Sequence, residues 1–330
     1  MLEGNCIRYY NFGNPKDVLK MEKRGINPLL EEEILVRMIT APINPSDLIP
    51  ITGAYSHRID LPHIPGYEGV GIVVDVGRSV PKSLIGKRVL PLRGEGTWQE
   101  YVKTSAKYAI QIPATIDDDL AAQLYINPVT AWLTCTETLK LKPDDTLLVN
   151  ACGSAIGHIF VQLSNILGFR LIAITRNDDY TKELLKLGAS HVINTSVTPL
   201  YNTVMELTKG VGATAAIDSV GGKDGSELAF CVRPNGVFLT IGLLSGIPIN
   251  WSDISKRTNI EVKLFHLRYW NAKVSVQTWQ DTFNHIITLL KGDHLQLKYS
   301  RAKYKLEDVN KAVQIAESPS HHKGKILLTY

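Results

Sequence analysis

The sequence predicts an α/β protein in which a small β-rich domain precedes a doubly wound parallel sheet. Its 330 residues suit about two domains. The first third holds short segments rich in Val, Ile and Leu that Gly and Pro separate, as in a small barrel or sandwich. From Asp117 onward, strand-like and helix-like segments alternate, which is typical of a parallel sheet with helices on both faces.

The expected elements follow from these patterns in order. In the first third we expect strands over residues 33–39, 69–77, 87–92 and 97–104. The alternating part predicts strands over 146–151, 171–175, 191–194, 215–218, 236–242 and 260–265, with helices over 156–167, 178–187, 200–209 and 225–232. The last stretch predicts helices over 278–291 and 306–318 and a strand over 323–330, which could complete either domain.

Composition and charge exclude several classes of protein. Hydrophobic residues make up 44% and charged residues 21%, as in a folded globular chain. The net charge of +4 is scattered and too weak for nucleic-acid binding. No apolar run reaches the roughly 18 residues of a membrane span, and no signal peptide is evident. Four widely spaced cysteines form no CxxC pair, so we expect a cytoplasmic protein without a disulfide framework.

A turn of small residues lies between the first strand and the first helix of the alternating part. It spans residues 149–157, and small side chains there let the backbone approach a pyrophosphate at the helix N-terminus. Against the pattern G-x-G-x-x-G, Cys152 and Ser154 replace the first two glycines and only Gly157 remains. The motif is degenerate, but its position at the start of the first βαβ unit favours dinucleotide binding over tight packing alone.

The end of the next strand indicates which dinucleotide binds. An NAD site places Asp or Glu about 20 residues past the turn, where it binds the ribose. Here the strand ends in Thr175 and Arg176, and a guanidinium would bind a 2′-phosphate. The sequence therefore predicts NADPH as the cofactor. Asp178 and Asp179 lie close by and weaken this interpretation, and Arg176 could instead be a solvated charge.

These residues resemble the medium-chain dehydrogenase/reductase superfamily over essentially the whole chain. Its zinc-free branch, with the quinone oxidoreductases and mitochondrial-type 2-enoyl thioester reductases, is similar in residues 41–47, 65–71, 126–132 and 187–189. Gly53-Ala54-Tyr55 and Asn127–Ala131 look most like the enoyl thioester reductases. The resemblance implies a GroES-like β-barrel domain over residues 1–125, a Rossmann domain over 126–266, and a segment over 267–330 that returns to the first domain.

The resemblance also implies roles for individual residues. Tyr55 and Asn127 would be catalytic, and a homodimer with a sheet continuous between subunits is expected. Arg176 would contact the 2′-phosphate. The cofactor-binding residues as a whole would be Asn44, Asn127, Thr130, Ser154, Ala155, Ile156, Arg176, Ile241, Gly242, Phe265, His266, Leu267 and Lys325. Tyr180 occupies a position where related quinone reductases often place a lysine.

A metal site is not expected. Zinc-dependent members need a thiolate near the start of the first domain and a histidine beside a glutamate, but this chain has Ser46, Asp47 and Tyr67 at those positions. A catalytic zinc needs about three protein ligands. His57 and His63 lie nearby, but neither has a spaced partner. Without zinc to stabilise an alkoxide, alcohol dehydrogenation is disfavoured.

Reduction of an activated C=C bond suits the remaining residues. Hydride would add at the carbon β to a carbonyl, and a phenol such as Tyr55 could stabilise the enolate oxygen or deliver the proton. Trp270 and Phe265 could line an acyl pocket, although aromatic residues more often pack in a core. We therefore expect a reductase of small-molecule enoyl thioesters. The alternatives are an NADPH:quinone oxidoreductase and an NADPH-binding protein with secondary chemistry.

Overall fold

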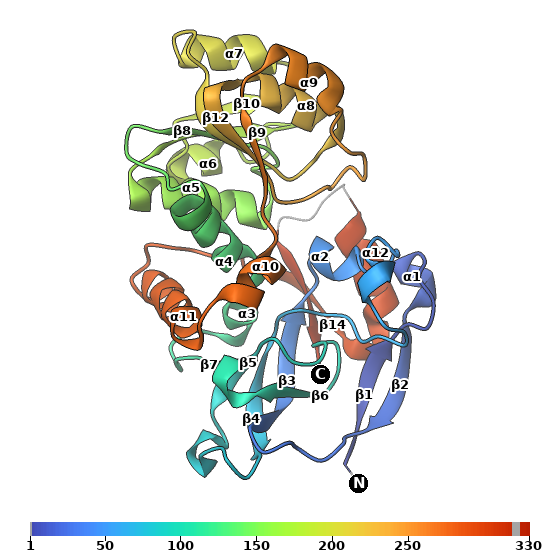
Figure 1. Cartoon of the computed structure of the whole chain (residues 1–330). Helices are drawn as coiled ribbons and strands as arrows, with labels where there is room; N and C mark the ends of the chain where they lie inside the picture. The colour runs from blue at the N-terminus through green and yellow to red at the C-terminus, as the bar shows by residue number, and fades with distance from the viewer. Residues whose placement is uncertain (1, 319–323) are drawn as a thin grey trace. The chain divides into compact units, whose positions relative to one another are not determined.

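The computed structural model describes residues 2–318 and 324–330 and divides into two compact units (Figure 1). The β-rich unit comprises Met1–Ile126, Val274–Lys291 and Leu297–Tyr330. The parallel-sheet unit comprises Asn127–Lys273 and Gly292–Gln296. The chain therefore passes from the first unit to the second between Ile126 and Asn127, inside a helix that carries two of the predicted site residues.

The β-rich unit is built on a seven-stranded sheet. Its strand β3 (Glu33–Pro42) pairs antiparallel with the C-terminal strand β15 (Lys325–Thr329), and β14 (Ser300–Lys305) lies parallel to β15. This pairing places Lys325 beside the segment that follows β3. The other strands of this unit are β1 (Glu3–Arg8), β2 (Lys20–Gly25), β4 (Val70–Val76), β5 (Arg88–Pro91), β6 (Tyr101–Ser105) and β7 (Ala109–Gln111).

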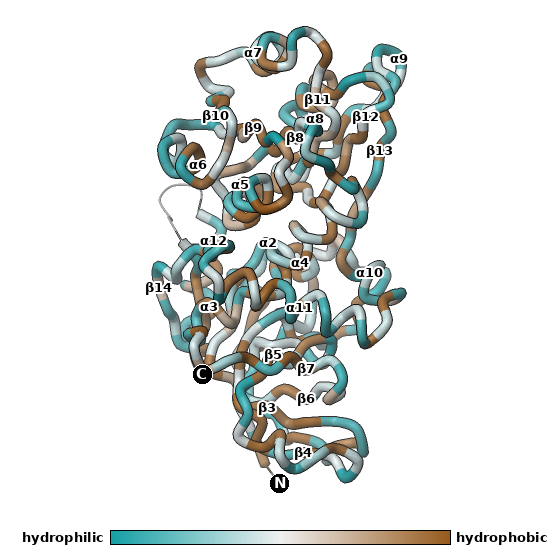
Figure 2. Tube along the Cα trace, turned by 90° about the vertical axis from the view of Figure 1, so that its left-hand side faces the viewer, coloured by the Kyte–Doolittle hydropathy of each residue, from teal (hydrophilic) through white to brown (hydrophobic). Residues whose placement is uncertain are grey.

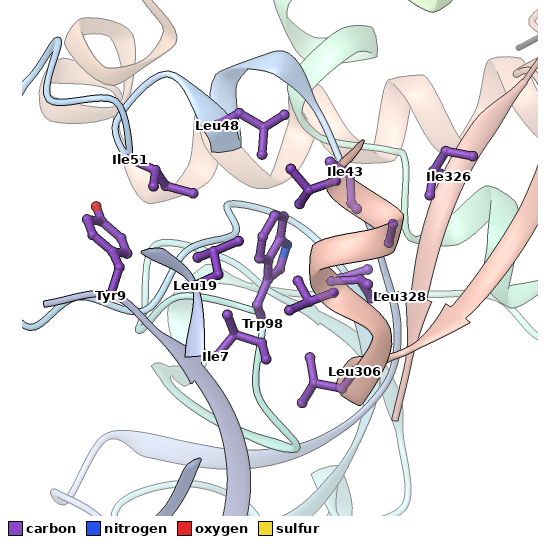
Figure 3. Packing of buried hydrophobic residues seen from close by; sticks show 14 residues of the cluster. Ile7, Tyr9, Leu19, Ile43, Leu48, Ile51, Trp98, Leu306, Ile326 and Leu328 are labelled. Carbon is purple, nitrogen blue, oxygen red and sulfur yellow. The ribbon is translucent and has the colours of Figure 1, made fainter. Parts of the chain in front are cut away.

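A buried cluster holds the β-rich unit together around Trp98. Figure 3 shows its indole among apolar side chains from β1, from the segment after β3 and from β15. Ile7, Ile51 and Leu328 are fully buried in this cluster. Burial of one such side chain contributes about 1.5–3 kcal/mol. The cluster thus fixes the segment after β3, which carries Asn44 and Asp47.

The parallel-sheet unit has the strand order β10-β9-β8-β11-β12-β13, and every neighbouring pair is parallel. This order reverses between β8 and β11, where ligands bind in open α/β sheets. Figure 2 shows hydrophobic colour along these central strands, in keeping with the buried Leu148, Ile172 and Ala216. The strands are β8 (Thr146–Val149), β9 (Arg170–Thr175), β10 (His191–Asn194), β11 (Ala213–Asp218), β12 (Val232–Thr240) and β13 (Glu261–Leu264).

Helices complete both units. Those of the parallel-sheet unit are α5 (Ala155–Leu167), α6 (Thr181–Leu187), α7 (Leu200–Leu207), α8 (Gly222–Phe230), α9 (Trp251–Arg257) and α10 (Leu267–Lys273). Those of the β-rich unit are α1 (Pro15–Val18), α2 (Pro45–Leu48), α3 (Asp118–Ala121), α11 (Val276–Lys291) and α12 (Val309–Glu317), and α4 (Ile126–Leu133) begins at the last residue of this unit's first segment and continues into the parallel-sheet unit. Among the described residues, no helix combines the length and the apolar character that crossing a bilayer would require.

The predicted α/β class and parallel sheet are confirmed, with shifts at several element ends. The helix expected from residue 178 begins at Thr181, because the Asp178 carboxylate accepts a hydrogen bond from the Thr181 hydroxyl at 3.1 Å within the preceding loop. The sequence interpretation missed α4, in which Pro128 is tolerated because the first turn needs no N–H partner. It also missed the strands β1, β2, β7 and β14 and the helices α1, α2, α3, α9 and α10. Residue 323 of the predicted last strand lies outside the described residues.

Candidate active site

Asn44 and Lys325 meet in the interior of the β-rich unit. The Lys325 ammonium donates to Oδ1 of Asn44, and Nδ2 of Asn44 donates to Oε1 of Glu68 at 2.7 Å. All three side chains are buried. Burial lowers the pKa of Lys325 and raises the pKa of Glu68, because both lose water around their charged forms. The structure thus brings together two predicted cofactor residues and adds Glu68, which the sequence interpretation had left without a role.

Glu68 also holds the start of α4. Its Oε2 accepts hydrogen bonds from the backbone N–H groups of Tyr125 at 3.0 Å and Ile126 at 2.9 Å. A carboxylate at a helix N-terminus satisfies N–H groups that have no partner within the helix. Asn127 and Thr130 lie on this helix and are half-buried.

Asp47 is the second buried carboxylate of the β-rich unit. It accepts hydrogen bonds from the backbone N–H groups of Asn44 at 2.7 Å and Tyr67 at 3.0 Å. Burial raises the pKa of Asp47 from its ordinary value of 3.8 to about 7, since desolvation outweighs these donors. Two carboxylates therefore share the single ammonium of Lys325 in this part of the unit.

Tyr55 lies on a turn that Gly53 makes possible. Gly53 has φ +93°, a left-handed conformation that glycine adopts without a steric penalty. Tyr55 is half-buried, and the Arg58 guanidinium lies over its ring at 3.8 Å from the centroid. This cation–π contact holds one face of the phenol ring and fixes its orientation.

The turn after β8 has the geometry of a phosphate-binding turn. Ser154 is the N-cap of α5, and its hydroxyl accepts a hydrogen bond from the Gly157 N–H at 3.2 Å. A Cβ on Gly157 would lie 2.5 Å from Cα of Cys152, so only glycine fits there. The predicted Ser154, Ala155 and Ile156 thus form the first turn of a 13-residue helix, where a pyrophosphate would meet backbone N–H groups.

The loop after β9 leaves Arg176 exposed. Of the two nearby acids, Asp178 is engaged within the loop. Asp178 accepts hydrogen bonds from Nδ2 of Asn194 at 2.8 Å and from the Thr181 hydroxyl, so its carboxylate already has partners within the loop. Asp178 is therefore a weaker candidate for binding the ribose of an NAD cofactor, and Arg176 is favoured as the charged group that contacts a ligand.

The remaining predicted cofactor residues follow the carboxyl ends of β12 and β13. The Ile241 N–H donates to the Asp218 carbonyl at 2.9 Å, and the Phe265 N–H donates to the Thr240 carbonyl at 2.9 Å. Gly242 approaches the Ser219 backbone closely, because a Cβ there would lie 3.1 Å from the Ser219 carbonyl oxygen. His266 and Leu267 come directly after Phe265 in the chain and are half-buried.

A buried pair at the strand reversal was missed by sequence reasoning. Asn150 lies just past β8, and its Nδ2 donates to the Asp218 carboxylate, at the end of β11, at a distance of 2.5 Å. Oδ1 of Asn150 accepts the Ser219 N–H at 2.8 Å. The pair joins the phosphate turn to the turn after β11. The signal that the sequence offers for this pair is a polar residue at the end of each of two apolar strands.

The positions of a superfamily zinc site hold other residues. Asp47 is committed to backbone N–H groups, and Tyr67 is exposed. Within residues 2–318 and 324–330, no three or more His, Cys, Asp or Glu side chains are grouped so that they could hold a metal ion. The zinc-free assignment stays a prediction.

Comparisons with known proteins agree with this architecture. The family model described as the alcohol dehydrogenase GroES-like domain matches residues 30–114, and the one described as zinc-binding dehydrogenase matches residues 155–286. A mitochondrial enoyl-[acyl-carrier-protein] reductase of Xenopus tropicalis is 30% identical over 339 aligned positions, covering 99% of this chain and 96% of that protein.

Two solved structures are also similar over nearly their whole length. A protein from Bacillus thuringiensis, provisionally assigned as an NADPH:quinone reductase, is 62% identical with a TM-score of 0.98, and each chain is covered completely. The quinone oxidoreductase of Escherichia coli, solved as a complex with NADPH, is 25% identical with a TM-score of 0.89, covering 99% of this chain and 100% of that one.

The two-unit fold and these relatives define the class of protein. The chain belongs to the medium-chain dehydrogenase/reductase superfamily. Within that superfamily it is an oxidoreductase whose relatives include both enoyl reductases and quinone oxidoreductases.

Proposed function

We propose that this oxidoreductase uses NADPH to reduce the C=C bond of trans-2-enoyl thioesters carried by coenzyme A or acyl carrier protein. The observation that carries the substrate assignment is Tyr55, a half-buried phenol on a glycine turn with its ring oriented by Arg58. The Xenopus tropicalis relative, whose name specifies an enoyl-[acyl-carrier-protein] reductase, supports the same substrate class.

The proposed cofactor follows from the parallel-sheet unit. Exposed Arg176 directly follows β9, and the neighbouring Asp178 carboxylate accepts hydrogen bonds from Asn194 and Thr181. A free guanidinium there would bind a 2′-phosphate, whereas an acid would repel it. The phosphate turn at the start of α5 would receive the pyrophosphate. The NADPH complex of the Escherichia coli relative supports this assignment.

The chain's own residues would then promote the reaction as follows. NADPH, when bound, supplies the hydride, which adds at the carbon β to the thioester carbonyl. As negative charge develops on the carbonyl oxygen, the Tyr55 hydroxyl donates a hydrogen bond or transfers its proton toward the α carbon. Asn127, at the start of α4, is proposed to contact both the cofactor and the reacting group, with the Glu68 carboxylate fixing the start of its helix.

Quinone reduction is the second candidate function. The observation that favours it is the 62% identity to the Bacillus thuringiensis protein assigned provisionally to that activity. A quinone accepts hydride and can take its protons from water, so it needs the Tyr55 phenol less than an enoyl thioester does.

NADPH oxidation measured over a panel of enoyl thioesters, quinones and enones tests the proposal. We expect a higher kcat/KM for 2-enoyl thioesters than for quinones, because hydride addition to an enoyl thioester forms an enolate that the phenol can stabilise. Turnover confined to quinones would transfer the assignment to the second candidate. Absence of NADPH oxidation with every acceptor would favour a cofactor-binding protein with secondary chemistry.

A further inference from the structure

The His158 side chain lies between the two segments that we assign to the phosphates of the cofactor. Its Nδ1 is 2.9 Å from the backbone carbonyl oxygen of Ser154, in the phosphate turn. Its Nε2 is 3.2 Å from Oε1 of Glu183, on α6 beyond the Arg176 loop. The His158 side chain is 4% exposed and that of Glu183 is 52% exposed, so a buried ring joins a surface carboxylate to the turn.

Two acceptor oxygens face the His158 ring. A carbonyl oxygen and a carboxylate oxygen can only accept hydrogen bonds, whereas a neutral imidazole has a single N–H. A proton on Nδ1 lets the ring donate to the Ser154 carbonyl oxygen, and the Glu183 carboxylate lies 3.2 Å from the other ring nitrogen. Glu183 itself lies in the first turn of α6, where a negative charge is favourable.

Tyr180 adds a second connection between the same two segments. Its ring meets the His158 ring edge-on, with centroids 5.3 Å apart and an interplanar angle of 87°. It also lies against the phosphate turn, since a Cβ on Gly153 would be 2.9 Å from Cδ2 of Tyr180. Tyr180 directly precedes α6, and Glu183 lies in its first turn. The turn and the loop therefore touch through two side chains rather than one.

We propose that His158, Tyr180 and Glu183 form a strut that sets the Arg176 loop at a fixed position relative to the phosphate turn. The strut thereby determines the preference for a dinucleotide that carries a 2′-phosphate. This inference rests on the proposed NADPH-dependent function and deepens it by naming positioning residues for cofactor specificity. None of the three needs to touch the 2′-phosphate itself.

The opposite side of the loop is already fixed to β10. The Ser196 hydroxyl, just past β10, donates to the Arg176 carbonyl, and Nδ2 of Asn194, at the end of β10, donates to the Asp178 carboxylate at 2.8 Å. These bonds hold the backbone on the β10 side, and the strut holds the start of α6 on the α5 side. A guanidinium binds phosphate strongly only when its geometry is correct, so small displacements of the loop would weaken that contact.

The substitution Glu183→Gln distinguishes a role of Glu183 in positioning the loop from a purely electrostatic effect of its charge on the cofactor. Removing a negative charge near a phosphate site would, by electrostatics alone, tighten the binding of an anionic cofactor. The strut predicts the reverse: NADPH should bind about 5- to 10-fold more weakly, with NADH within about twofold of wild type. The measurement is titration of the wild-type and variant proteins with NADPH and NADH, after thermal unfolding has shown that each variant is folded.

Two further variants complete the test. Tyr180→Leu removes the ring without a change of charge and should lower NADPH affinity selectively, as Glu183→Gln does. Glu227→Gln is the matched control, because Glu227 forms an exposed ion pair with Lys223 on α8 of the same unit, at 3.6 Å. It should leave both affinities unchanged.

The outcomes are distinguishable. Selective loss of NADPH affinity in both strut variants supports the proposal. Unchanged or tighter NADPH binding by Glu183→Gln, or equal weakening of NADPH and NADH in either strut variant, overturns it. A wild-type protein that binds NADH as tightly as NADPH instead contradicts the proposed function on which the strut rests.

Discussion

Asn44 and Lys325 are 281 residues apart in the chain and share one buried hydrogen bond. Their meeting depends on the pairing of β15 with β3, in which the Ile43 N–H donates to the Ile326 carbonyl at 3.0 Å. Family resemblance pointed to both residues, but no local pattern could have shown that they contact each other. The role of Glu68 could not be predicted for the same reason, since its hydrogen-bond partners come from two segments that are distant in the sequence, Asn44 and Tyr125–Ile126.

Asp47 should make the stability of the β-rich unit depend on pH. Because its folded pKa of about 7 lies above the ordinary 3.8, the folded state holds the proton more tightly. The resulting stabilisation is complete below about pH 4 and is lost as pH rises to about 7. Between these limits the free energy of unfolding should fall, relative to Asp47→Asn, by at most about 1.4 kcal/mol per pH unit.

Urea unfolding of the wild-type and Asp47→Asn proteins at pH 5, 6 and 7 measures this difference. Asparagine keeps one acceptor oxygen for the N–H groups of Asn44 and Tyr67 but does not titrate. Parallel pH profiles for the two proteins would show that Asp47 titrates with an ordinary pKa.

Arg176 should contribute directly to the choice of cofactor. Replacing it with Ala removes the exposed guanidinium at the end of β9, so NADPH binding should weaken by roughly 1–3 kcal/mol and NADH binding should change little. Titration with both cofactors measures this. If both weaken equally, Arg176 does not act on the 2′-phosphate.

At the scale of elements, the phosphate turn explains why its motif is degenerate. Cys152 replaces the first glycine because its side chain is buried and directed at the Val149 carbonyl, 3.2 Å from Sγ. Ser154 replaces the second glycine and caps α5 with its hydroxyl. Gly157 remains because the Cys152 backbone occupies the space that a side chain would need.

The substitution Gly157→Ala should therefore damage this turn. Its Cβ would lie 2.5 Å from Cα of Cys152, and backbone cannot move aside as a flexible side chain can. We expect a loss of about 1–3 kcal/mol in the free energy of unfolding, together with weaker binding of NADPH. Chemical denaturation and NADPH titration measure the two effects. Wild-type values for both would contradict the close packing on which the turn depends.

Elements were easier to predict than their contacts. The strands from β8 to β13 and the amphipathic α5 follow from periodicity, which depends only on neighbouring residues. The contact of His158 with Glu183 depends on how α5 and α6 pack, and the sequence offers no period or spacing that predicts it. The strand β2 carries mostly exposed, charged side chains, and β1 has only Cys6 and Ile7 as buried apolar residues, so alternation of apolar residues was weak in both.

At the scale of the whole molecule, β13 forms one end of the parallel sheet. Its apolar side chains are exposed: Val262 is 49% and Leu264 is 69% accessible. An exposed apolar edge strand is prone to pair with another chain. We predict that two copies join through β13 about a two-fold axis, so that the sheet continues between subunits.

Light scattering at micromolar concentration should give the mass of a homodimer. Leu264→Lys, which places a charge on the edge, should shift the equilibrium toward monomer, because a buried unpaired ammonium is costly at an interface. Lys223→Leu on α8 serves as a control away from the edge. A wild-type protein that is strictly monomeric would refute the predicted assembly.

The most direct test of the central claim is steady-state reduction of a 2-enoyl thioester by the wild-type and Tyr55→Phe proteins. If the Tyr55 hydroxyl acts on the developing enolate, its removal should lower kcat and kcat/KM together by roughly 10²–10³-fold, with NADPH affinity and thermal stability nearly unchanged. If the Tyr55 hydroxyl is only structural, its removal should lower the free energy of unfolding by about 1 kcal/mol and leave turnover unchanged. Near-wild-type rates for Tyr55→Phe on enoyl thioesters would contradict the catalytic role of Tyr55 and favour quinone reduction.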